Sequence, residues 1–178
     1  ILHTWRIFLE KMVGIIVLQI VLIILNAIFS SAEISVISMN ETKIKQMAEE
    51  GDRRAEKAVL LLEKPAKFLE AIQAAVTFAG LLSGAFVAVY FAEIVKSVLL
   101  EVFAGRMIAS EQVIYGVSVI VVTLILTYVN LLFGEILPKR AAMSKSEDDA
   151  FKMIGILFLA AKLFAPLAGL LHISSNIF

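Results

Sequence analysis

Three long apolar blocks, separated by charged segments, dominate the pattern of hydrophobic and polar positions along this chain. The blocks cover about residues 12–38, 71–91 and 112–137. A helix needs roughly 20 apolar residues to cross the hydrocarbon core of a bilayer, and each block is long enough. We therefore predict an all-α integral membrane protein with three transmembrane helices.

A fourth apolar block, about residues 153–173, is near this length threshold and is less uniform. It contains Lys162, Pro166 and Gly169, and Lys152 directly precedes it. These residues favour a helix or broken helix that lies at the membrane interface. A fourth transmembrane span is the alternative.

The basic residues of the connecting segments predict the orientation in the membrane. Segments 41–67 and 139–152 are rich in lysine and arginine, whereas segment 93–111 holds only Lys96 and Arg106. By the positive-inside rule, segment 41–67 is cytoplasmic and segment 93–111 lies outside. The N-terminus is then outside and the C-terminus cytoplasmic. We predict a helical hairpin over 41–67, either simply solvated or a docking surface for a cytoplasmic domain.

The composition supports a membrane protein and excludes several kinds of chemistry. Hydrophobic residues make up 60% of the chain and the mean hydropathy is +0.92, whereas a soluble domain is nearer half apolar. The zero net charge gives no indication of a nucleic acid partner, and the lack of cysteine excludes disulfides and thiolate sites. The predicted spans hold no histidine or aspartate, and no HExxH pattern occurs, so we expect no enzyme.

One carboxylate stands where a charge is costly. Glu135 lies near the end of the third block, and a charged side chain at membrane depth costs about 2.5–3.5 kcal/mol on insertion scales. Gly134 before it and Pro138 after it loosen the helix. Because Pro138 has no backbone N–H, the carbonyl near Gly134 loses its helical partner. This combination predicts a cation site, with an ion pair to Lys139 one turn on as the alternative.

Other polar and small residues interrupt the blocks at helical spacing. One set in each block shares a helix face: Asn26, Ser30 and Glu33; Thr77, Gly80 and Gly84; Thr127, Asn130 and Gly134. Small residues are also the ordinary interface residues of packed membrane helices, so close packing is the favoured interpretation of Gly80 and Gly84 taken alone. Glu33 near the cytoplasmic end is also explained by snorkelling to the interface or by pairing with a lysine.

The available ligands favour a hard cation. Magnesium and calcium take oxygen ligands from carboxylates, amides, hydroxyls, backbone carbonyls and water. The predicted spans offer all the protein groups in that set and no sulfur ligand except methionine, whereas a transition-metal carrier more often shows histidine or cysteine. The sequence therefore predicts an oxygen-lined site for a hard cation beside Glu135.

These residues resemble the transmembrane domain of the CNNM/CorC family of magnesium transporters. The resemblance is carried by Phe29-Ser30-Ser31-Ala32-Glu33, by Ala71-Ile72-Gln73 and, most specifically, by Phe133-Gly134-Glu135-Ile136-Leu137-Pro138-Lys139. It implies a homodimer of three-span subunits with a juxtamembrane helical belt, in a prokaryotic plasma membrane. It also implies magnesium export coupled to sodium entry by alternating access.

The resemblance further implies a set of residues that face the metal ion: Asn26, Ser30, Gly80, Ser83, Gly134 through its backbone, and Glu135. Pro138 shapes the bent part of the third span. Many family members have a serine in place of Asn26 and asparagines in place of Val76 and Gly80. Two polar side chains of the second span are therefore absent here, and carbonyls or hydroxyls would have to replace them.

A second function is consistent with the same residues. A membrane anchor or magnesium sensor would bind the ion and report occupancy to a cytoplasmic domain without transporting it. The family usually continues into a short acidic helical bundle and a paired CBS module that binds magnesium with ATP. We expect these parts to lie outside the present chain, which begins and ends in apolar residues.

Overall fold

The computed structural model describes residues 2–63, 65–102, 110–144 and 147–175, and within these ranges it contains helices and no strand. Two short stretches, η1 and η2, are π-helical. The elements follow in this order: α1 (Leu2–Ile37), α2 (Glu41–Glu49), α3 (Arg53–Glu63), α4 (Pro65–Ser83), η1 (Gly84–Ala88), α5 (Val89–Val102), α6 (Glu111–Leu131), η2 (Leu132–Ile136), α7 (Leu137–Met143), α8 (Glu147–Leu163) and α9 (Ala165–Ser175).

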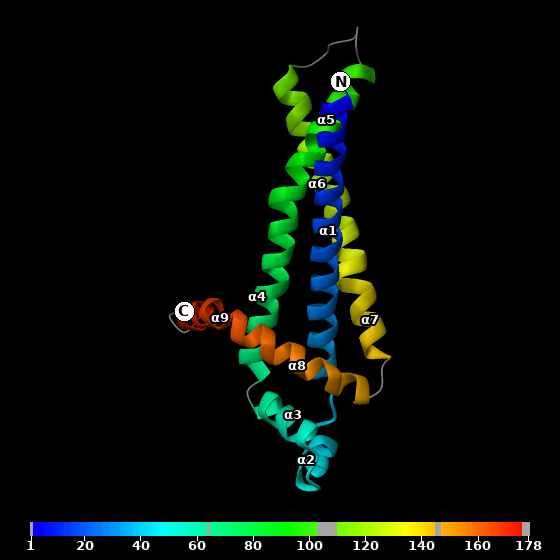
Figure 1. Ribbon diagram of the computed structural model, residues 1–178. Coiled ribbons are helices and arrows are strands. Elements are labelled where there is room, and N and C mark those ends of the chain that lie inside the picture. Colours follow the sequence, from blue (N-terminus) through cyan, green and yellow to red (C-terminus); the bar gives the residue numbers. More distant parts are fainter. Residues whose placement is uncertain (1, 64, 103–109, 145–146, 176–178) are drawn as a thin grey trace.

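Three long helical rods form the body of the molecule (Figure 1). The first is α1, the second is α4 continued by η1 and α5, and the third is α6 continued by η2 and α7. α1 packs against α4 and, on the third rod, against η2 and α7, while α5 packs against α6. The all-α fold predicted from the hydropathy pattern is confirmed.

Two helical stretches are long and apolar enough to cross a membrane. They are Met12–Ile37 and Glu111–Met143; the first matches the predicted span 12–38 to within one residue, and the second contains the predicted span 112–137. A third candidate is the pair Arg53–Glu63 and Phe68–Ser83, if these helices, bent by 85°, are counted as one span. The residues predicted for the second span, 71–91, lie in α4, η1 and the start of α5.

The segment predicted as a helical hairpin contains two short helices, α2 and α3. Asn40 begins α2, because its side-chain oxygen accepts a hydrogen bond from the Lys43 amide at 3.2 Å. Gly51 separates the two helices with φ of +91°, a backbone conformation that L-residues with a side chain rarely adopt. Charged and apolar residues alternate at helical spacing in both, so that each buries one face.

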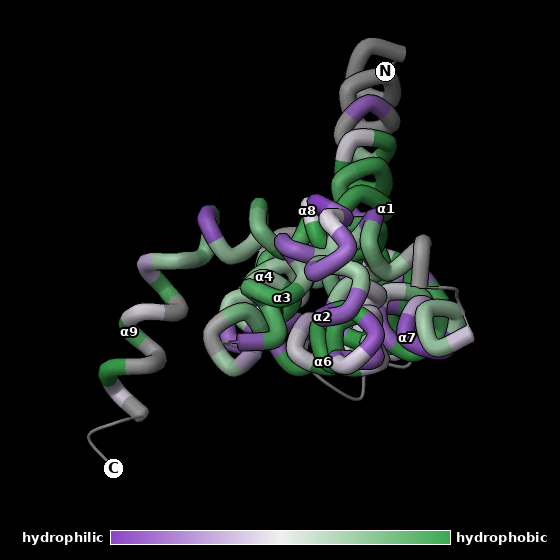
Figure 2. Tube along the Cα trace, turned by 90° about the horizontal axis from the view of Figure 1, so that it is seen from below, coloured by the Kyte–Doolittle hydropathy of each residue, from purple (hydrophilic) through white to green (hydrophobic). Residues whose placement is uncertain are grey.

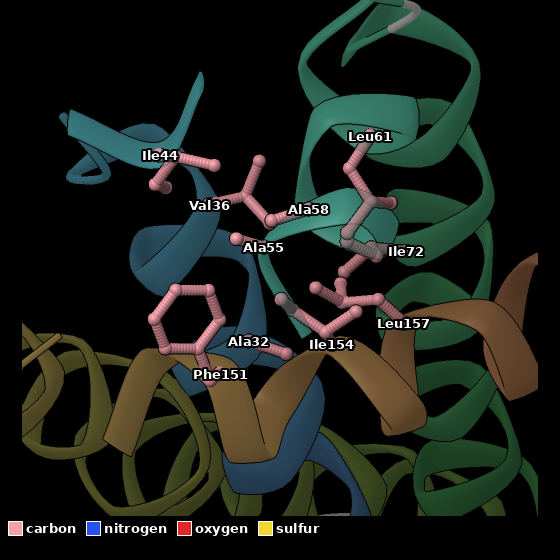
Figure 3. Packing of buried hydrophobic residues seen from close by; sticks show 10 residues of the cluster. All are labelled: Ala32, Val36, Ile44, Ala55, Ala58, Leu61, Ile72, Phe151, Ile154 and Leu157. Carbon is pink, nitrogen blue, oxygen red and sulfur yellow. The ribbon is translucent and has the colours of Figure 1, made fainter. Parts of the chain in front are cut away.

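A cluster of buried apolar side chains lies at this end of the molecule, where α1, α2, α3, α4 and α8 meet (Figure 3). Ten buried side chains form the cluster, which we call the belt core: Ala32, Val36, Ile44, Ala55, Ala58, Leu61, Ile72, Phe151, Ile154 and Leu157. Alanines let the short helices approach closely, while the larger residues fill the space between them. The belt core thereby holds the ends of α1 and α4 against α8.

α8 and α9 lie across the long rods rather than along them (Figure 1). Seen from the α2–α3 end, α9 extends away from the other helices (Figure 2). These two helices contain the fourth apolar block, and Phe164 lies in the short break between them. An interfacial position for this block agrees with the crosswise orientation and stays a prediction.

Candidate cation site

Three polar side chains lie on one face of α1 at intervals of seven residues: Gln19, Asn26 and Glu33. Residues seven apart share a helix face, and the axial rise from Gln19 to Glu33 is about 21 Å at 1.5 Å per residue. Gln19 and Asn26 are only 7% and 3% exposed. Each of the three contacts a polar side chain of another helix: Gln19 contacts Ser83 of α4, Asn26 contacts Asn130 of α6, and Glu33 contacts Lys139 of α7. We call these three side chains of α1, together with their three partners, the polar track.

At the centre of the polar track, two amide side chains from different rods lie together. Asn26 Nδ2 donates a hydrogen bond to Asn130 Oδ1 at 3.4 Å, which is long for this kind of bond. Asn26 Oδ1 is fully buried and has no hydrogen-bond partner among the described residues. A buried acceptor in this state costs about 1–3 kcal/mol, so the centre of the bundle holds an unsatisfied oxygen.

Gly134 in η2 brings its backbone directly against these amides. A Cβ atom at position 134 would lie 2.8 Å from Asn130 Oδ1 and 3.0 Å from Asn26 Nδ2. Real Cβ atoms essentially never come as close as 2.8 Å, so only glycine fits without displacing an amide. The absence of a side chain is therefore what allows the third rod to approach α1 at this point.

The second rod contributes Gly80 to the same neighbourhood. A Cβ atom there would lie 3.7 Å from Asn130 Nδ2, an ordinary contact distance. On this side a cavity of about 290 Å³ lies between the second rod and α6, and its wall combines apolar side chains with small and polar ones: Thr77, Gly80, Leu81, Ser83, Gly84, Ala88, Thr123, Leu126, Thr127, Asn130 and Leu131. The amide cluster thus adjoins a space that has hydroxyl groups in its wall.

The helix loosening predicted around Gly134 takes the form of a π-helical turn. The Leu137 N–H donates to the Leu132 carbonyl, a step of five residues in place of the four of an α-helix. Pro138, which lacks a backbone N–H, follows at the start of α7. The rod widens here without breaking. Single π-helical turns are often found at functional sites, and η1 is a second one, in the rod that contains Gly80.

One turn beyond Asn26 on α1, a second buried oxygen is unsatisfied. Ser30 is 0% exposed, and its hydroxyl has no hydrogen-bond partner among the described residues. The neighbouring Ser31 hydroxyl donates to the Pro138 carbonyl at 3.4 Å and so links α1 to α7. Asn26 and Ser30 therefore present two unsatisfied oxygen-bearing groups on one face of α1.

Ser83 lies at another level of the polar track. Its hydroxyl donates to Gln19 Oε1 at 2.6 Å, in a buried contact between α4 and α1. Gln19 Nε2 is buried without a partner among the described residues. Because Gln19 and Asn26 are seven residues apart, this contact lies about 10 Å along the helix from the amide cluster.

Glu135 is held in an ion-pair cluster with two other charged side chains. Lys139 Nζ lies 2.9 Å from Glu135 Oε1 and 3.1 Å from Glu33 Oε2, and the three side chains are 20% to 33% exposed. We call these three residues the charge triad. The alternatives left open for Glu135 and Glu33, pairing with a lysine, are the contacts that the structure contains.

The predicted metal-facing residues are therefore distributed along the polar track. Asn26, Gly80 and Gly134 converge on one point, and Ser30 lies one turn away. Ser83 belongs to the Gln19 contact, and Glu135 to the charge triad. No group of three or more histidine, cysteine or acidic side chains suited to a metal occurs among the described residues, so the convergent ligands are mainly neutral oxygens.

Asn130 was missing from the predicted metal-facing set, although it contacts Asn26 and borders both glycines. It shares a helix face with Gly134, four residues later, and a carboxamide in a transmembrane helix needs several hydrogen-bond partners. That signal was present in the sequence. The sequence did not show that Asn26 lies across the bundle from Asn130, because only the packing of the first and third rods brings the two together.

Comparisons with known proteins agree with the transmembrane architecture. A family model described as the Cyclin M transmembrane N-terminal domain matches residues 17–178. The chain is 36% identical to the UPF0053 protein sll0260 of Synechocystis over 161 residues, which make up 88% of this chain and 34% of that protein. It is 27% identical to the polyamine export protein of Haemophilus influenzae over 159 residues, 89% of this chain and 35% of that protein.

A third relative gives the same coverage. The chain is 32% identical to a UPF0053 protein of Haemophilus influenzae over 158 residues, which are 88% of this chain and 33% of that protein. This chain thus spans about a third of the length of the curated relatives that it matches.

Proposed function

This chain belongs to the Cyclin M transmembrane family, and from that premise we propose that it moves a cation across the bilayer, with magnesium as the cargo. Transport proceeds by alternating access of a site between the three rods. Magnesium leaves the cell in exchange for sodium that enters, as the family resemblance implies. Membership of the family and the bacterial relatives support the membrane location on which this proposal depends.

One observation carries the proposal: unsatisfied oxygen atoms are buried at the point where the three rods converge. Asn26 Oδ1 and the Ser30 hydroxyl are buried without partners, and the Gly134 backbone lies against the amide cluster. Amide, hydroxyl and backbone carbonyl oxygens are ligands that magnesium accepts. A bound cation would satisfy these oxygens and offset the cost of leaving them unpaired.

The neutral character of these ligands fits an ion that keeps part of its water. Magnesium gives up its hydration shell reluctantly and is usually held by one or two carboxylates together with water. Glu135 follows Gly134 directly and is the nearest carboxylate along the chain to the amide cluster. We propose that Glu135 supplies the charge, while Asn26, Ser30 and the Gly134 backbone supply neutral contacts to the ion or its water.

The proposed working unit is a homodimer in the lipid bilayer. The faces of α1 and α6 that point away from the bundle carry exposed apolar side chains, for example Ile24, Leu124 and Tyr128. Lipid or a second copy of the chain would cover them, because large exposed apolar surfaces are unfavourable in water. In the longer protein we propose a paired CBS module, with bound magnesium and ATP, as the cytoplasmic partner.

A polyamine is the second candidate cargo. Two relatives, from Haemophilus influenzae and Salmonella typhimurium, are named polyamine export proteins and are each 27% identical to this chain. The charge triad adds a structural reason, because the Lys139 ammonium already lies between two carboxylates. An alkylammonium group of a polyamine would make the same kind of contact.

Flux measurements on the complete protein in proteoliposomes test these proposals. Magnesium flux is measured with and without an opposed sodium gradient, and spermidine flux is measured in parallel. The variant Glu135→Ala should abolish flux while the protein still assembles. Arg140→Gln, an exposed charge close by on α7, is the control and should transport normally.

The outcomes separate the candidates. Sodium-dependent magnesium flux that Glu135→Ala abolishes supports the exchanger. Spermidine flux without magnesium flux identifies a polyamine as the cargo in place of magnesium. Magnesium binding without movement of either cargo identifies the sensor. Normal magnesium flux in Glu135→Ala would refute the role given to this carboxylate.

A further inference from the structure

In the charge triad, Lys139 forms an ion pair with Glu135, the carboxylate that is proposed to bind the cargo. Lys139 Nζ lies 2.9 Å from Glu135 on its own rod and 3.1 Å from Glu33 on α1. The contact with Glu135 is a charge-assisted hydrogen bond, and the longer contact with Glu33 is an ion pair. The ammonium group is therefore shared between two carboxylates that belong to two different helices.

The charges of the triad do not balance. Two carboxylates and one ammonium group leave a net charge of −1 when all three side chains are ionised. The triad lies between the first rod (α1) and the third rod (α6–η2–α7), at the end of these rods that is next to the belt core. Uncompensated charge at partial membrane depth is unfavourable, so the triad retains an attraction for one more cation.

From this arrangement we propose that Lys139 is a tethered competitor of the transported cation. Without cargo, its ammonium group neutralises Glu135. When the cargo reaches Glu135, the ammonium group withdraws to Glu33 alone, and it returns as the cargo leaves. This inference rests on the proposed cation transport and concerns the regulation of the same site.

The geometry suits such an exchange. The lysine side chain is a flexible four-carbon stem with a compact charge, so its ammonium group can change partner without movement of the backbone. Both carboxylates are already within reach, and the Ser31 hydroxyl bound to the Pro138 carbonyl keeps α1 beside α7. Glu33 is therefore a ready second partner on a neighbouring helix.

The exchange has a consequence for transport kinetics. A carboxylate that is always neutralised, by lysine or by cargo, avoids the cost of an isolated charge between transport cycles. The same competition weakens cargo binding and speeds its release. Lys139 thus lowers the affinity for the cargo and raises the turnover rate. Glu33 has the opposite effect, because it draws the ammonium group away from Glu135.

Two variants should shift the affinity in opposite directions. Lys139→Gln removes the competitor, so the KM for magnesium should fall by about tenfold or more, and maximal flux should fall with it because release slows. Glu33→Gln leaves the ammonium group committed to Glu135, so KM should rise. Arg140→Gln changes the charge as Lys139→Gln does, outside the triad, and should leave both quantities near their original values.

The measurement is magnesium flux into proteoliposomes against magnesium concentration, with the complete protein and equal amounts of each folded variant. Opposite shifts of KM for Lys139→Gln and Glu33→Gln support the inference. Equal KM values, or shifts in the same direction, would overturn it and leave Lys139 as a structural ion pair.

Two further results are also decisive. If Lys139→Gln does not fold, Glu33→Gln decides alone, since an unchanged or lower KM contradicts the competitor. If the unmodified protein moves no magnesium, the proposed cargo fails first, and the same pair of variants is measured with spermidine. An absence of opposite shifts there as well refutes the inference.

Discussion

The belt core and the centre of the polar track are both buried, but they are built from opposite chemistry. The belt core joins five helices through apolar side chains such as Leu61 and Leu157, each 1% exposed or less. The polar centre joins three rods through two amides and two glycines, and it buries oxygens that have no partner. One region gains stability from apolar burial, whereas the other leaves buried oxygens unpaired at a cost in stability.

This difference separates the effects expected from mutations. Removing an apolar side chain from the belt core should lower stability and leave the transport of each folded molecule intact. Disturbing the polar centre should impair transport with little loss of stability, because an unsatisfied buried group contributes nothing favourable to folding. The following variants test this separation, from the largest expected effect to the smallest.

Among these variants, Gly134→Ala should have the largest effect on transport. The new Cβ would lie 2.8 Å from Asn130 Oδ1, so the amides or the third rod must shift. We expect magnesium flux to fall by about a hundredfold, because a misplacement on the order of 1 Å can cost that much in a positioned site. Gly116→Ala on the same rod meets nothing within 4 Å and should transport normally.

Leu61→Ala should have the largest effect on stability. This side chain is 0% exposed in the belt core, and a buried leucine-to-alanine change costs about 2–5 kcal/mol. The melting temperature in detergent should fall clearly, while flux per folded molecule stays unchanged. Leu60→Ala is the matched control, since Leu60 is 54% exposed. Similar losses in both variants would contradict the role of the belt core.

The double variant Asn26→Leu with Asn130→Leu should lower transport, by less than Gly134→Ala does, with almost no cost in stability. Replacing both partners of a buried polar pair with apolar groups of similar shape is often neutral or stabilising. Asn26→Leu alone should be less stable than the double variant, since Asn130 then loses its partner. Thermal melting and flux of the three proteins measure this. A double variant much less stable than either single one would show that the amides stabilise the fold.

The smallest expected effect is on the pH dependence of stability at the turn between α2 and α3, where Asp52 lies. Hydrogen bonds from the side chain and backbone of Arg54 hold the pKa of Asp52 below its usual value. The resulting stability is present above the unfolded-state pKa near 3.8 and is lost as the pH falls through the lower folded-state pKa. Melting temperatures below about pH 4 should therefore differ less between the protein and Asp52→Asn than they do at neutral pH.

Several features of the candidate site could be predicted from the sequence. The unusual position of Glu135, the loosened helix near Gly134 and the polar face with Asn26 and Ser30 were visible as interruptions of apolar blocks. The lysine that could reach Glu135 was visible as well, one turn further on. Each of these is a local relation along one helix, where spacing determines which residues share a face.

The sequence by itself determined the long apolar helices, the charged hairpin and the residue types available for a cation, because periodicity and membrane thickness act along the chain. Only the tertiary structure decided which polar residues meet. It brought Asn130 to Asn26, gave Ser83 to Gln19 and joined Glu33 to Lys139. The physical reason is that these contacts depend on the rotation and axial shift of one packed rod against another, and many side chains set these together.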